Sequence, residues 1–67
     1  MDDVEKHYTT MEVAELLRIH PRTLERWRAA GEGPRFVLLG GLVRYPASAV
    51  SSFLEARTVA PRTEVAS

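Results

Sequence analysis

Arginine is the residue type through which this 67-residue chain could do chemistry. Residues 18–44 carry six arginines and only two acidic side chains, whereas residues 1–17 carry five acidic side chains and one lysine. A guanidinium group presents a planar fork of donors that matches a phosphate or the edge of a guanine base. The chain is therefore polarised although its formal net charge is zero, and its basic part is a candidate surface for a polyanion. An ordinary solvated face is the alternative, and charge alone does not decide between the two.

The other residue types offer no second kind of site. The chain has no cysteine, which excludes disulfides and thiolate zinc ligands. Its two histidines, His7 and His20, have no carboxylate pair at ligand spacing, so we expect no metal. The serines near residue 50 are expected on a helix surface, and the glycines match no nucleotide-binding fingerprint. We therefore expect no cofactor, no catalytic residue and no enzymatic activity.

Two short helices joined by a turn must position the first of these arginines. Thr9 and Glu12 have the spacing of a capping box, and an apolar stripe follows, which predicts a helix over about residues 10–18. Proline is favoured at the first position of a helix, so a second helix is predicted from Pro21 to residue 30, with Gly31 as its stop. Residues 18–20 are then the turn of a helix-turn-helix.

The second helix has two different sides when its residues are placed at about 100° intervals. Its apolar side is formed by Leu24, Trp27 and Gly31. Its opposite side carries Arg22, Arg26 and Ala29, with Glu25 at the edge and with Thr23 and Arg28 flanking the apolar side. A major groove admits one helix, and residues near the helix N-terminus reach the base edges. The outward arginines therefore suit DNA recognition as well as a solvated surface.

A β-hairpin is predicted after this helix. Residues 35–39 and 42–45 are β-type runs that flank Gly40 and Gly41, and tight hairpin turns need positive φ. The glycine tip leaves room for a phosphate backbone, and Arg44 lies near the base of the hairpin. Phe36, Leu38 and Val43 are expected to cover a core centred on Trp27, which we expect to touch Leu16 or Leu17.

The predicted fold is mainly α with a β-hairpin, a small winged helix-turn-helix with the order α-α-β-β-α. A third helix is expected from residue 46 or 47 to near 57. Residues 8–57 form the DNA-binding domain in this interpretation, residues 1–7 a flexible arm and residues 58–67 a flexible tail. No apolar run approaches the ~20 residues that span a bilayer, so we expect no membrane partner and a cytoplasmic, nucleoid-associated protein in a bacterial host.

Three segments of the chain resemble the excisionase family, which is related to the MerR-type winged helices. They are YTTMEVAELL at residues 8–17, HPRTLERW at residues 20–27 and GGLVRYP at residues 40–46. The resemblance extends over about residues 8–56. It departs from the family at His20, where a serine-like helix cap is usual, and at Leu42, where a basic residue is common.

The resemblance implies a small phage protein that binds and bends double-stranded DNA at an attachment site. Several copies would bind head-to-tail and direct a phage integrase from integration towards excision, as a recombination directionality factor. The implied DNA contacts are Arg22, Thr23, Glu25 and Arg26 on the second helix and Gly40, Gly41 and Arg44 on the wing. Arg28 joins them as a further arginine of the basic segment.

Two other functions remain open on the sequence. A small phage or prophage transcription regulator has the same fold, and a protein–protein adaptor would use the wing and tail for a partner. MerR-type regulators carry a long dimerising helix after the winged domain, whereas ten residues follow Arg57 here. We therefore expect a monomer in solution. On DNA we expect a head-to-tail array in which the acidic segment of one copy faces the basic segment of the next.

Overall fold

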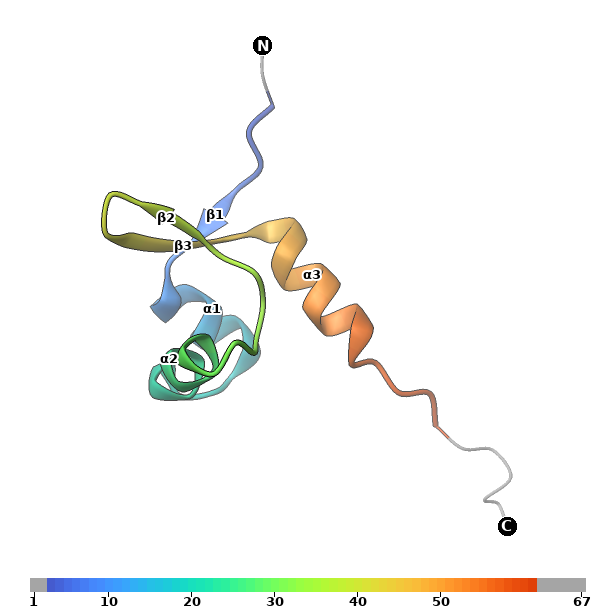
Figure 1. The fold of residues 1–67 in the computed structure, drawn as a ribbon. Helices are drawn as coiled ribbons and strands as arrows, with labels where there is room; N and C mark the ends of the chain where they lie inside the picture. The colour runs from blue at the N-terminus through green and yellow to red at the C-terminus, as the bar shows by residue number, and fades with distance from the viewer. Residues whose placement is uncertain (1–2, 62–67) are drawn as a thin grey trace.

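The computed structural model describes residues 3–61 (Figure 1). The elements are β1 (His7–Tyr8), α1 (Thr10–Leu17), α2 (Pro21–Ala29), β2 (Val37–Leu39), β3 (Leu42–Pro46) and α3 (Ala47–Ala56). The three strands form one antiparallel sheet in the order β1-β3-β2. Three helices with a hairpin between α2 and α3 confirm the predicted winged helix-turn-helix.

The start of α1 is fixed by a reciprocal capping box, as predicted. The hydroxyl of Thr9 accepts a hydrogen bond from the backbone N–H of Glu12 at 3.1 Å, and the Glu12 carboxylate accepts one from the N–H of Thr9 at 2.9 Å. The helix ends one residue earlier than expected. Arg18 adopts the left-handed conformation with φ 58° and ψ 44°, which turns the chain towards α2.

Helix α2 begins at Pro21, as predicted, and its cap is His20. The imidazole Nδ1 of His20 accepts a hydrogen bond from the N–H of Arg22 at 3.0 Å, so histidine does the work of the usual serine-like cap. The helix ends at Ala29, with Ala30 as its C-cap. The following Gly31 has φ +76°, which favours glycine, and it is exposed instead of lying on the apolar side of the helix.

The hairpin has the predicted two-residue turn. Leu39 pairs with Leu42, and the turn between them is Gly40 and Gly41. Of the two turn residues, Gly40 has positive φ (64°) and Gly41 does not, which is the pattern of a type II′ turn. Strand β2 begins at Val37, two residues later than expected, so that Arg35 and Phe36 lie before it.

Strand β1 was not predicted, and it joins His7, the last residue of the segment interpreted as a flexible arm, to the sheet; residues 1 and 2 of that segment lie outside the described residues. His7 pairs with Pro46 and Tyr8 with Tyr45, while the Lys6 carbonyl accepts from the N–H of Ala47 at 2.9 Å. Two residues are too few to show an alternating pattern, so no sequence signal predicts this strand.

Glu5 continues the attachment of the N-terminal segment to α3. Its carboxylate accepts hydrogen bonds from the N–H and the hydroxyl of Ser48 at 2.8 and 3.0 Å. Pro46, the N-cap of α3, makes no side-chain cap bond, so Glu5 satisfies an amide that the local sequence leaves open. These bonds lower the pKa of the Glu5 carboxyl, the backbone bond from Ser48 having the largest effect.

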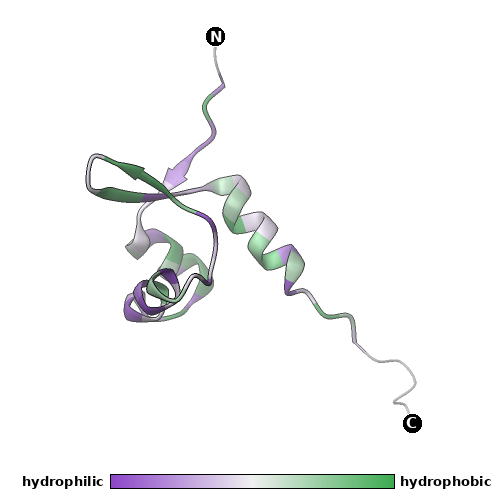
Figure 2. Cartoon of the chain, viewed as in Figure 1, coloured by the Kyte–Doolittle hydropathy of each residue, from purple (hydrophilic) through white to green (hydrophobic). Residues whose placement is uncertain are grey.

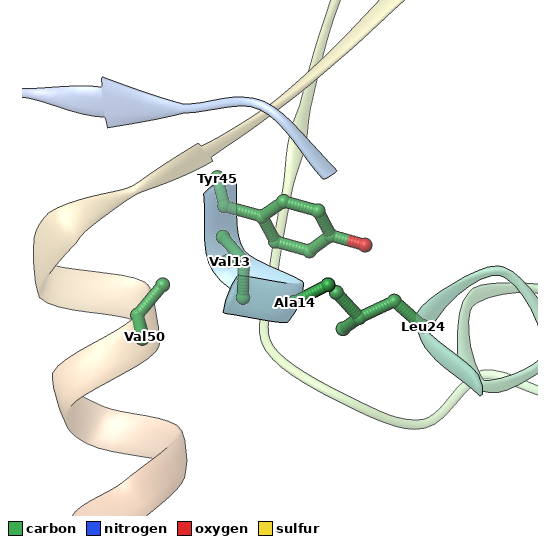
Figure 3. Close-up of a cluster of buried hydrophobic side chains, with 5 residues drawn as sticks. All are labelled: Val13, Ala14, Leu24, Tyr45 and Val50. Carbon is green, nitrogen blue, oxygen red and sulfur yellow. The ribbon is translucent and has the colours of Figure 1, made fainter. Parts of the chain in front are cut away.

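The hydrophobic core is centred on Tyr45 and not on Trp27 (Figure 3). Its buried members are Val13, Ala14, Leu24, Tyr45 and Val50. Tyr45 is 1% exposed and is the largest fully buried side chain. Trp27 is half-buried and lies beside this cluster, with its ring centroid 5.5 Å from that of Phe53 on α3.

The hairpin covers less of the core than expected. Phe36 contacts the ring of Tyr45 and Val43 packs against the cluster, but Leu38 is 65% exposed. Figure 1 shows why, because the tip of the hairpin extends past the helices. Trp27 is covered instead by the loop after α2. A Cβ atom on Gly33 would lie 3.2 Å from the Trp27 Cβ, so this glycine allows the loop to approach closely.

Candidate nucleic-acid interface

The outward side of α2 carries the two arginines that the sequence singled out. Arg22 and Arg26 lie one turn apart and are both exposed, as are Glu25 and Ala29. The opposite side is anchored by Leu24, which is 1% exposed in the core against α1. Burial of Leu24, together with Trp27 packed beside the same cluster, determines which face of the helix points outward.

The position of Arg22 is unfavourable for the helix itself. It lies in the first turn, where the positive end of the helix dipole disfavours a cation, and α2 has no acidic residue in that turn. Arg26, in the last turn, is placed favourably for the dipole. The positive charge of Arg22 therefore does not stabilise the helix. It is suitably placed to bind an external anion such as phosphate.

Arg28 lies on a different side of the same helix and is half-buried. Its Nη1 donates to the Tyr45 hydroxyl at 2.9 Å and has a longer contact of 3.5 Å with the hydroxyl of Thr10. Its guanidinium also lies 5.7 Å from the ring centroid of Phe36. The structure thus separates Arg28 from Arg22 and Arg26. Its assignment as a DNA contact stays a prediction, as does that of Thr23, which is half-buried.

The wing tip is open and without polar side chains. Apart from the glycine itself and its chain neighbours, nothing lies within 4 Å of the position that a Cβ would take on Gly40 or Gly41. Arg44 is half-buried on β3, and its Nη1 donates to the carbonyl of Val43 at 2.8 Å. Arg35 is exposed just before β2. Both arginines therefore lie towards the base of the hairpin and not at its tip.

Leucines surround this tip; of these the sequence analysis named Leu42, as a departure from the family, and Leu38, as a residue expected to cover the core. Leu38, Leu39 and Leu42 are 65%, 56% and 57% exposed. The signal was present in the unbroken apolar run at residues 36–39, because successive strand residues point to opposite faces. Such a run places apolar side chains on both faces of the hairpin. Figure 2 shows the contrast between the hydrophobic hairpin and the mainly hydrophilic α2.

The two histidines are engaged in local backbone contacts. His7 Nδ1 lies 2.9 Å from the carbonyl oxygen of Glu5, and His20 caps α2. Within residues 3–61 no three metal-ligating side chains gather into a group that could hold an ion. In the same part of the chain no helix has the length and apolar character to cross a membrane.

Helices α1 and α2 with their short turn, followed by a glycine-tipped hairpin, define the class of winged helix-turn-helix domains. The family model described as helix-turn-helix domain matches residues 8–58, and the chain belongs to that family. The family includes excisionase-like DNA-binding domains, and membership indicates that this chain binds DNA. No curated protein and no solved structure gave a significant match to the chain.

Proposed function

We propose that this chain is a sequence-specific DNA-binding and DNA-bending protein that acts as a phage excisionase. In this role it binds attachment-site DNA in several copies and directs an integrase towards excision. The observation that carries the proposal is the exposed arginine pair, Arg22 and Arg26, on the second helix of a helix-turn-helix domain. The likeness of residues 8–56 to excisionases supports the recombination role. The chain itself catalyses nothing in this proposal, since strand exchange belongs to the integrase.

In the proposed complex α2 enters the major groove with its outward side. Arg26 makes a bidentate contact with a guanine, and Arg22, at the N-terminal end, reaches a phosphate or a neighbouring base. Glu25 lies between them and can accept a hydrogen bond from a cytosine amino group. The wing reaches the adjacent groove, with Arg44 near the phosphate backbone.

Cooperation between copies belongs to the same proposal. A single DNA-binding module buries only ~600–1,000 Å² of protein surface, so one copy binds weakly. The acidic residues of the N-terminal segment and the basic residues of the central segment give opposite charges to two parts of the chain. Successive copies on directly repeated sites can therefore attract one another.

The test begins with selection of duplexes from a random library by the wild-type chain. Gel shifts on one, two and three tandem copies of the selected site then measure affinity and cooperativity. Arg26→Ala should weaken specific binding by about 1–3 kcal/mol. Arg57→Ala removes an exposed arginine at the C-cap of α3, where its guanidinium lies over the Phe53 ring and not on the outward side of α2, and should bind as wild type.

An excision reaction with the integrase encoded in the same genome tests the recombination role. We expect the chain to stimulate excision, and Arg26→Ala to abolish that stimulation. Binding to a promoter site without any effect on excision would favour the transcription regulator instead. Failure of the wild-type chain to bind any selected duplex would contradict both functions and favour the adaptor.

A further inference from the structure

The wing ends in an apolar pair whose exposure the core does not explain. Leu39 and Leu42 are cross-strand partners and form the last pair before the turn. Both are more than half exposed, whereas the hairpin contributes Tyr45 to the buried cluster and only the partly buried Val43 packs against that cluster nearer the tip. Because Gly40 and Gly41 have no side chains, the two leucines form the end of the ribbon.

Exposed leucines that lie together are typical of an interaction surface, since isolated exposed apolar residues are common but clusters are not. Leu38 extends the apolar surface onto the other face of the hairpin. Both faces of the tip are therefore apolar, and the tip resembles a wedge more than a flat docking surface.

The charges of the hairpin indicate what the wedge enters. Residues 33–46 include two arginines, Arg35 and Arg44, and no acidic side chain. An apolar end on a cationic base is complementary to DNA, which presents an anionic backbone outside and apolar base faces inside. Proteins that bind the minor groove commonly insert leucine or similar side chains between base pairs and kink the duplex.

We propose that Leu39 and Leu42 form an apolar wedge that enters the minor groove and partly unstacks one base step. This inference rests on the proposed DNA-binding function and assigns the bending to named residues. Arg35 and Arg44 lie behind the wedge and approach the flanking phosphates. Pyrimidine–purine steps such as TA and CA unstack most easily, so the wedge selects such a step at a fixed distance from the α2 contact.

The variants for the test are chosen to keep the fold. In Leu39→Thr/Leu42→Thr both exposed leucines become β-branched residues that suit a strand. Leu39→Met/Leu42→Met keeps an apolar tip and serves as the rescue variant. Leu54→Gln is the matched control, because Leu54 is 45% exposed on α3, away from the hairpin (Figure 1). Circular dichroism confirms that each variant is folded.

The readouts are the bend of a selected duplex with fluorophores at both ends and the fluorescence of 2-aminopurine placed at successive steps. We expect the wild-type chain to kink DNA within the ~20–90° range of minor-groove wedges and to raise 2-aminopurine fluorescence at one step. The threonine variant should lose that signal and at least about half of the bend, while the methionine variant and Leu54→Gln keep both.

Three results would overturn the inference, and only one of them would also contradict the proposed function. Unchanged bending by the threonine variant would show that the leucines do not enter DNA. Unchanged bending together with loss of self-association in sedimentation would make the tip an interface between copies of the chain. If the wild-type chain binds no duplex at all, the proposed function and the wedge both fail.

Discussion

Arg28 and Arg26 lie two residues apart on α2. We expect Arg28→Ala to lower the stability of the domain strongly and Arg26→Ala to leave it nearly unchanged. Arg28→Ala removes a hydrogen bond from a charged donor to the buried Tyr45, worth about 1.5–3 kcal/mol, and a cation–π contact with Phe36, worth about 0.5–1 kcal/mol. A domain of this size rarely has more than ~3–5 kcal/mol of stability. Arg28→Ala should therefore remove about half or more of the free energy of unfolding. Arg26→Ala changes an exposed side chain and should alter it by less than about 0.5 kcal/mol.

Thermal unfolding followed by circular dichroism measures the difference. A loss of 1 kcal/mol lowers the midpoint by roughly 4–8 °C in a domain of 60–100 residues, so Arg28→Ala should lower it by about 10 °C or more. A cycle with Tyr45→Phe isolates the coupling between the two side chains. Below its midpoint, Arg28→Ala should keep the salt dependence of wild-type DNA binding. A midpoint within about 2–3 °C of wild type would refute the stabilising role of Arg28. A salt slope reduced by about 1 would show that Arg28 contacts phosphate.

Three further predictions concern the turn and the helix ends. Arg18→Gly should raise the free energy of unfolding by about 0.5–1 kcal/mol in urea titrations, because it relieves left-handed strain at φ 58° but adds freedom to the unfolded chain. Thr9→Ala breaks the capping box with Glu12 and should cost about 0.5–2 kcal/mol by the same measurement. The pKa of Glu5 is lowered by its bonds from Ser48, so the stability it contributes is present above the ordinary carboxyl pKa and is lost as pH falls through the lowered one. The unfolding midpoint of Glu5→Gln should accordingly depend less on pH in the acidic range than that of wild type, and equal slopes would refute this role of Glu5.

The local signals in the sequence predicted the elements well. The capping box, Pro21 and the glycine pair each act through the backbone within a few residues, so their effects can be read without the tertiary fold. The outward side of α2 followed from helical spacing alone. In each case the local backbone structure is determined by residues that are neighbours in the sequence.

The misassigned features depend on contacts between residues far apart in sequence. Trp27 has the size of a core residue, but Tyr45 occupies the centre because β3 lies between β1 and β2 and packs on α1 and α3. Strand β1 exists only because β3 offers an edge, and Glu5 reaches a helix that begins more than 40 residues later. The apolar run at residues 36–39 places apolar side chains on both faces of the hairpin, but how far the hairpin projects past the helices, and so how exposed Leu39 is, depends on the tertiary fold.

The link between Arg28 and Tyr45 bears on how the two proposed DNA-contacting elements are held relative to each other. Helix α1 packs on both α2 and β3, and Leu24 enters the core beside Tyr45. Arg28 adds a direct connection, because it starts on α2 and ends on the hydroxyl of a β3 residue three positions from Leu42. A domain that reads bases with α2 and unstacks a step with its wing needs a constant distance between the two. In the proposed complex Arg28 would fix that distance from inside the domain, because its guanidinium donates to the Tyr45 hydroxyl.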